Sequence, residues 1–117
     1  MIKQLIIVNR LPNLSKAEFL NHWRNTHAPL IASVSAAVGI RRYVQLSPLS
    51  DGSPLSKASN LECDGIAEVW FDSVASVLSG AASSEAKAAM KRIREDEERF
   101  IDRSRTQVIW GEEAQVI

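Results

Sequence analysis

The sequence predicts an α+β domain in which four short strands and two helical regions follow the order β-α-β-β-α-β. Three observations indicate this class. A chain of 117 residues, 45% of them hydrophobic, has the size of a single domain, residues 1–117, and can bury an adequate core without disulfides or metals. Four runs of β-branched and aromatic residues are bounded by turn-forming residues. The stretches between them carry apolar residues at helical spacing.

Composition excludes several classes of partner. The 14 Lys and Arg residues balance 14 Asp and Glu residues and are interleaved with them, which argues against nucleic-acid binding. One cysteine, Cys63, allows neither an internal disulfide nor a cysteine-based metal cluster and suggests a reducing compartment. The apolar run within Met1–Arg10 is too short for a signal peptide or a membrane span. We therefore expect a small cytoplasmic domain with no membrane partner.

The first third of the chain contains a strand and a helix start. Ile2–Arg10 is short and β-branched, and the Leu11–Asn13 turn closes it. Ser15–Glu18 then forms a capping box, in which the Ser and Glu side chains satisfy free amides at a helix start. The helical pattern continues until Gly39.

An apolar face runs along this helical region. With Phe19 as zero and about 100° per residue, Trp23 falls near 40°, Val34 near 60° and His27 near 80°, at the edge of the face. Pro29 lies inside the pattern and has no N–H to donate, so we expect a kink or break beside His27.

The same signals place the remaining elements. They are a strand Ile40–Leu46, a long irregular loop Pro48–Cys63, a strand Asp64–Phe71, a short helix capped by Asp72 and Ser73 that runs through Leu78, a helix Ser84–Phe100 and a last strand Arg105–Glu112. The loop has few large apolar side chains, so we expect it to be mobile or ordered only by a partner subunit.

This order is that of a ferredoxin-like domain, a four-stranded antiparallel sheet with helices on one face. A strand turns alternate residues to opposite faces, and we expect the purely apolar sets to lie under the helices: Ala67, Val69 and Phe71 on the third strand, Val44 and Leu46 on the second. The other sets are mixed and aromatic-rich, and they would form the open face: Asp64, Ile66, Glu68 and Trp70 with Arg41, Tyr43 and Gln45. Such a face suits a partner sheet and a half-polar cavity, which favours a homodimer through the face of Tyr43, Ile66, Glu68 and Trp70.

Several segments together resemble the EthD-like family, named for a protein of ethyl tert-butyl ether degradation. They are Met1–Arg10 followed by Leu14-Ser15, Phe19-x-x-x-Trp23-x-x-x-His27-Ala-Pro-Leu30, Arg42-Tyr43-Val44-Gln45, Asp64-Gly-Ile-Ala-Glu-Val-Trp-Phe-Asp72 and Phe100-Ile-Asp102. The resemblance implies a dimeric α+β barrel formed through the sheets and small-molecule chemistry without an obligatory organic cofactor. Some relatives are fungal dehydratases or decarboxylases of aromatic polyketides, a related group isomerises lactones, and the ether-degradation member accompanies an oxidative system.

Two residues are candidates for catalysis. The His27 imidazole titrates near working pH and can take or give a proton. The alternative is a structural histidine that bonds a loop carbonyl, such as one freed by Pro29. Asp64 precedes Gly65, which permits close backbone approach, and could orient His27 or polarise a substrate hydroxyl. The alternative is a turn residue that bonds its own backbone.

Five further residues are candidates for substrate binding. Trp23, Tyr43 and Trp70 would supply flat apolar walls; alternatively, Trp23 belongs to the core and the other two to the dimer interface. Glu68 needs water or a partner such as Arg41, and a catalytic acid is its less favoured role. Arg41 could also hold an anionic substrate.

Metal and cofactor signals are weak or missing from the sequence. His22 lies about 140° from His27 around an α-helix, which would prevent both from binding one metal. Glu18 and His22 share a helix face, but two exposed ligands are weak evidence for a metal site. Nothing resembles a flavin, haem or nicotinamide site, so we expect no metal and no cofactor.

Two functions remain open at this stage. One is an enzyme of proton-transfer chemistry, such as dehydration, decarboxylation or isomerisation, on an aromatic or lactone-like substrate. The other is a non-catalytic small-molecule binder that assists an oxidative degradation pathway. The candidate base favours the enzyme.

Overall fold

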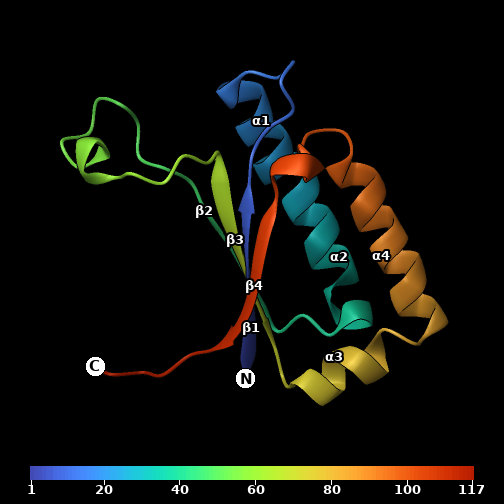
Figure 1. The fold of residues 1–117 in the computed structure, drawn as a ribbon. Coiled ribbons are helices and arrows are strands. Elements are labelled where there is room, and N and C mark those ends of the chain that lie inside the picture. Colours follow the sequence, from blue (N-terminus) through green and yellow to red (C-terminus); the bar gives the residue numbers. More distant parts are fainter.

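Four antiparallel strands form a sheet in the order β2-β3-β1-β4. The computed structural model describes residues 1–117, with β1 at Ile2–Val8, β2 at Arg42–Leu46, β3 at Gly65–Phe71 and β4 at Gln107–Glu112. The helices are α1 (Lys16–His22), α2 (Ala28–Val38), α3 (Val74–Gly80) and α4 (Ser84–Glu97). Figure 1 shows the sheet edge-on with all four helices on one side of it. The ferredoxin-like fold class is therefore confirmed.

The local signals for the helix ends are confirmed as well. Ser15 and Glu18 form the expected capping box at the start of α1. Ser73 caps α3, and Gly39 ends α2 with a φ of 77°, a left-handed conformation that glycine adopts without strain. The sheet strands are slightly shorter than expected; after β1 ends at Val8, Arg10 makes only an isolated bridge to Ile101.

The expected break beside His27 is present and takes the form of a π-turn. Residues Trp23–His27 form one wide turn between α1 and α2, in which the Ala28 N–H donates to the Trp23 carbonyl. Pro29 lies in the first turn of α2, directly after the π-turn, and has no N–H to donate back to that turn. A turn closed by bonds five residues apart brings residues with that spacing toward one face of the helix.

The core lies between the helices and one face of the sheet. On β3 the buried residues are Gly65, Ala67, Val69 and Phe71, as the alternation predicts. Gly65 makes the close approach suggested by the sequence, because a Cβ there would come within 2.5 Å of the Trp23 ring.

The predicted orientation of β2 is wrong. Tyr43 packs against the core, and Gln45 donates from Nε2 to the Trp23 carbonyl at 2.9 Å, so both face the helices. Val44 therefore lies on the open face with Leu46. The register explains the reversal: Tyr43 stands opposite the buried Val69, and directly opposed residues share a face of the sheet. Tyr43 can pack there, half-buried, because its hydroxyl accepts a hydrogen bond from Gln45.

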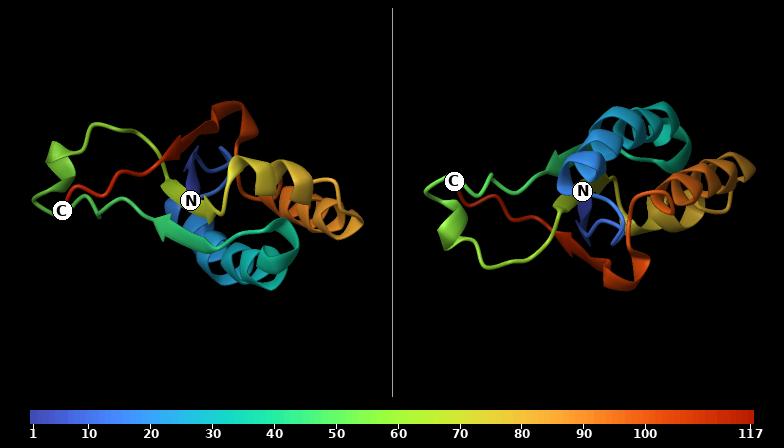
Figure 2. Two further views of the ribbon diagram at one scale, coloured as in Figure 1. Left: turned by 90° about the horizontal axis from the view of Figure 1, so that it is seen from below. Right: turned by 90° about the horizontal axis from the view of Figure 1, so that it is seen from above.

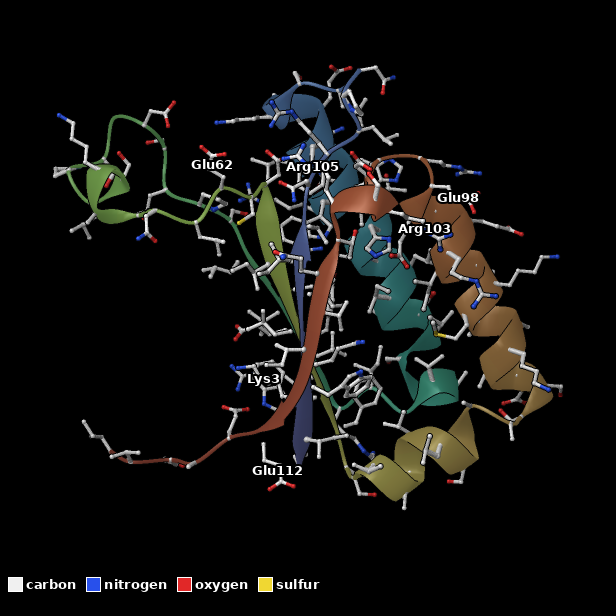
Figure 3. The ribbon with its side chains drawn as sticks, viewed as in Figure 1. Lys3, Glu62, Glu98, Arg103, Arg105 and Glu112 are labelled. Carbon is white, nitrogen blue, oxygen red and sulfur yellow. The ribbon has the colours of Figure 1, made fainter.

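The open face has an apolar part and a charged end. The register places six apolar residues on it: Leu5, Ile7, Val44, Leu46, Ile66 and Ile109. At the end that carries Lys3 (Figure 3), Lys3 pairs with Glu68 at 2.7 Å. Lys3 and Arg42 both lie over the Trp70 ring, at 4.8 and 4.6 Å from its centre. This face carries no helix.

Two segments extend away from the helices on the open side of the sheet. They are the loop 47–64, with a short 3₁₀ turn at Ser56–Ala58, and the C-terminal residues 113–117 (Figures 1 and 2). No helix of the chain combines the length and apolarity needed to cross a membrane.

Candidate active site

A cavity of about 410 Å³ lies between the helices and the covered face of the sheet. Eighteen of its 22 lining residues are hydrophobic, which makes it an apolar chamber with few polar groups. The polar residues in its wall are Gln4, His27, Glu97 and Thr106. Neither lysine nor arginine is among the lining residues.

His27 is held in the cavity wall by Asp96. The His27 Nδ1 atom lies 2.8 Å from Asp96 Oδ2, and each residue is only 5% exposed. The ring also packs on Phe100, with centres 5.0 Å apart. The Nε2 atom makes no hydrogen bond within the protein. Every fully buried side-chain nitrogen or oxygen has a hydrogen-bond partner, so Nε2 is not fully buried. Nε2 is therefore the nitrogen available to a ligand.

The same carboxylate holds a second imidazole. The His22 Nε2 atom lies 2.9 Å from Asp96 Oδ1, and the His22 ring packs on Phe100 at 4.5 Å. His22 and His27 thus share one partner, although α-helical geometry predicts that they point apart. The π-turn removes that separation, because residues five apart approach the same face. No group of three or more His, Cys, Asp or Glu side chains is arranged to hold a metal ion.

Burial determines the protonation of His27. Loss of solvent lowers the pKa of His27, which outweighs the raising effects of the hydrogen bond to Asp96 and of its charge; the nearby His22 lowers it further. The imidazole is therefore neutral near pH 7. The Asp96 carboxylate accepts from Nδ1–H, so Nε2 carries the lone pair of a base.

Glu97 and Tyr43 line the same cavity. Glu97 is half-buried and makes no hydrogen bond or ion pair with its carboxyl group. Burial raises the pKa of Glu97, and it also raises the pKa of Tyr43, whose hydroxyl accepts from Gln45 Nε2 at 3.2 Å. Both groups therefore favour their neutral forms more than they do in water.

Comparison with models of known protein families identifies the family of this chain. A model described as EthD domain matches residues 11–104. The chain belongs to the EthD domain family. A search of curated proteins gives no significant match.

Three solved structures resemble this EthD domain over nearly its whole length. An EthD family protein from Bacillus halodurans is 26% identical, covers 97% of this chain and 100% of its own, and has a TM-score of 0.63. A dimeric ferredoxin-like protein of unknown function from Bacteroides fragilis is 16% identical, covers 95% and 94%, and scores 0.60. SnoaB from Streptomyces nogalater, a cofactor-independent oxygenase, is 10% identical, covers 99% and 95%, and scores 0.56. The last two show the shared fold.

Asp64 lies apart from His27 in this EthD domain. It accepts from the Arg10 backbone N–H at 2.8 Å and pairs with the Arg10 guanidinium. These residues line a separate polar hollow of about 460 Å³ under the loop, together with Glu62 and Arg105 (Figure 3). The expectation that Asp64 orients His27 is wrong, because Asp96 occupies that position.

The candidate binding residues divide between two faces. Trp23 and Tyr43 line the cavity with His27, and the Trp23 ring is also part of the core at 1% exposure. Trp70 lies on the open face, where its indole N–H donates to Glu113. Glu68 lies there too, paired with Lys3 and not with Arg41.

Arg41 precedes β2 and pairs with Asp72 at 2.7 Å. It is on the exposed surface, outside the cavity lining.

Sequence reasoning missed Asp96 and Glu97. Both lie in the charge-dense run Lys91–Arg99, which reads as a solvated helix face. One signal does separate Asp96 from its charged neighbours. It continues the buried stripe of α4, in which Ala86, Ala89, Ile93 and Asp96 follow one another at spacings of three, four and three residues.

Proposed function

We propose that this EthD domain is a small-molecule enzyme that performs cofactor-independent proton transfer, in the form of dehydration, decarboxylation or isomerisation. Its substrate would be an aromatic or lactone-like compound of catabolism or secondary metabolism. The observation that carries the proposal is the neutral His27 imidazole, held through Nδ1 by Asp96 and free at Nε2, in the wall of an apolar cavity. SnoaB, described as a cofactor-independent oxygenase, has a similar fold, which is consistent with chemistry that needs no cofactor.

Each part of the site has a role in such a step. Nε2 of His27 takes a proton from a substrate carbon or hydroxyl, and the imidazolium that forms is stabilised by the Asp96 carboxylate. Asp96 also maintains the tautomer with the proton on Nδ1. The apolar walls, including Trp23 and Tyr43, exclude water and hold a flat ring.

The same proposal includes a homodimer through the open face of the sheet. Leu46 and Ile109 on that face are 54% and 64% exposed in the single chain, and four more apolar residues surround them. The charged end around Lys3 and Glu68 would form the polar rim. The Bacteroides fragilis neighbour is described as dimeric, which supports this arrangement.

The test of the catalytic proposal is the variant His27→Asn, assayed with a panel of aromatic β-hydroxy ketones and lactones. The amide retains similar bulk and one hydrogen bond, so we expect the fold to persist while turnover falls by about 10²–10⁴-fold. Unchanged turnover per folded molecule would remove His27 from the site. Saturable binding of the same compounds by the wild type without any turnover would favour the non-catalytic accessory binder.

A further inference from the structure

A second ionisable group shares the cavity with His27 and has no partner. Glu97 follows Asp96 on α4, and its carboxyl group makes no hydrogen bond or ion pair. The charged groups around it are occupied or directed elsewhere: Asp96 binds the two histidines, and Arg103 pairs with Glu98 beside the end of α4 (Figure 3). Arg94 is exposed. An unpaired, half-buried carboxyl group in an apolar cavity requires an explanation.

We propose that Glu97 is the second proton-transferring residue of the cavity, acting as the acid while His27 acts as the base, and that the substrate is an uncharged oxygenated aromatic or lactone-like molecule. This inference rests on the proposed function of His27.

The absence of cationic side chains from the cavity wall favours an uncharged substrate. No lysine or arginine lines the cavity, so a carboxylate or phosphate would enter an apolar space without a counter-ion. Glu97 would add repulsion whenever it is ionised. An uncharged ketone or lactone avoids both penalties and offers an oxygen that can accept a hydrogen bond from the Glu97 carboxyl group. Of the three reactions named above, dehydration and isomerisation fit this substrate better than decarboxylation, which begins from a carboxylate.

The environments of the two residues prepare them for opposite roles. Burial lowers the pKa of His27 and raises the pKa of Glu97. The Asp96 charge also raises the pKa of Glu97, while Arg103 and Arg94 lower it, and Glu97 in turn raises the pKa of Tyr43. A neutral imidazole and a carboxyl group that holds its proton more firmly than in water suit the roles of a base and an acid in one cavity.

The dehydration of a β-hydroxy ketone shows how the two residues would exchange protons with a substrate. Nε2 of His27 removes the α-proton, and the electrons of that C–H bond form the new C=C bond. Glu97 gives its proton to the β-hydroxyl group, whose C–O bond breaks, and water leaves. The imidazolium proton then returns to the Glu97 carboxylate, so the net products are an enone and water, with no oxidant, reductant or cofactor consumed. Lactone isomerisation needs the same pair, one removing a proton and the other supplying it.

The substrate class is tested first by binding, which needs no turnover. The probes are 1-tetralone, an uncharged aromatic ketone, and 1-naphthoate, a carboxylate of similar size, followed by NMR of the Trp23 and Trp110 indole N–H groups in the cavity wall. We expect the wild type to bind 1-tetralone at least tenfold more tightly than 1-naphthoate at pH 8. In Glu97→Gln the ratio of the two affinities should be smaller, because the variant lacks the carboxylate that repels 1-naphthoate. Equal binding of both probes by the wild type would overturn the assigned substrate class.

The role of Glu97 is tested by its pH profile. We expect the wild-type kcat/KM to fall at high pH as Glu97 loses its proton. In Glu97→Gln that alkaline limb should disappear and kcat should fall by about 10²–10⁴-fold with KM little changed. Glu95→Gln is the matched control on the same helix, since Glu95 is exposed and meets only Lys91 at 3.8 Å, and it should leave the profile unchanged.

Other outcomes separate this inference from the proposed function. If His27→Asn abolishes turnover while Glu97→Gln retains both turnover and the alkaline limb, the role of Glu97 is overturned and that of His27 stands. If His27→Asn retains turnover, the proposed function itself fails. Should Glu97→Gln not fold, a ¹³C titration of the Glu97 carboxyl group in the wild type decides: a pKa no higher than that of an exposed glutamate would contradict the assigned acid.

Discussion

Replacing Asp96 with asparagine removes the carboxylate shared by two imidazoles. His22 and His27 each hydrogen-bond one of its oxygens, at 2.9 and 2.8 Å, and a hydrogen bond to a charged group contributes about 1.5–3 kcal/mol. Asparagine keeps the shape and one acceptor oxygen, so we expect Asp96→Asn to lower the free energy of unfolding by about 1.5–3 kcal/mol. Asp96→Ala loses both bonds, and we expect about 3–6 kcal/mol.

The measurement is urea and thermal unfolding, followed by tryptophan fluorescence at pH 7.5. For a domain of this length, about 1 kcal/mol corresponds to roughly 4 °C in Tm, so Asp96→Asn should melt about 6–12 °C below the wild type. Glu95→Gln is the control on the same helix, because Glu95 is exposed and meets only Lys91 at 3.8 Å; a change below about 0.5 kcal/mol is expected. An Asp96→Asn variant as stable as Glu95→Gln would refute the reasoning.

The tautomer of His27 supplies an independent readout of the same variant. In the wild type, ¹⁵N NMR should show the proton on Nδ1, which donates to Asp96. In Asp96→Asn the side-chain amide can present its NH₂ group instead, which favours the opposite tautomer and removes the lone pair from Nε2. We therefore expect a mixed tautomer and a loss of turnover larger than the loss of folded protein. An unchanged tautomer would mean that Asp96 does not orient the ring.

Three further predictions concern packing, pH and assembly. Gly65→Ala should lower the free energy of unfolding in urea by about 1–3 kcal/mol, because the new Cβ would come within 2.5 Å of the Trp23 ring. Gly111→Ala is the control, since its Cβ meets open space, and should change stability by less than about 0.5 kcal/mol; equal values for the two variants would contradict this packing. Because the pKa of His27 is lowered in the folded state, the unfolded chain binds the proton more readily, so the free energy of unfolding should fall as pH drops from about 6.5 through the folded pKa. His27→Asn should flatten this pH dependence, and an unchanged slope would refute the lowered pKa of His27. Wild-type protein at micromolar concentration should sediment as a dimer and Ile109→Lys as a folded monomer; a monomeric wild type would exclude the proposed interface.

Much of the fold was predictable from the sequence because its signals are local. The capping box at Ser15–Glu18 and the helix end at Gly39 depend on hydrogen bonds within a few residues. The alternation on β3 assigns its faces correctly, since one of its two sets is purely small or apolar. The proline break beside His27 follows from one missing N–H.

The orientation of β2 was not predictable in this way. Hydrophobicity favours Val44 over Tyr43 for the core, yet the half-buried Tyr43 packs against the core because its register with Val69 turns it toward the helices. Burial then depends on Gln45, which reaches the tyrosine hydroxyl and the Trp23 carbonyl. A polar tip that finds its partner only in the assembled structure has no signature in a hydropathy pattern.

The sequence by itself determined the order of the elements, the family resemblance, and His27, Trp23 and Tyr43 as residues worth placing. The tertiary structure decided what surrounds His27. Asp96 lies 69 residues away along the chain, and only the packing of α4 against the π-turn brings its carboxylate to the imidazole. The same turn moves His22 from the far side of a regular helix to that carboxylate. Residue spacing predicts which side chains share a face of one helix or strand. It does not predict which side chain of a distant helix will lie beside a buried imidazole, because that depends on how the helices pack.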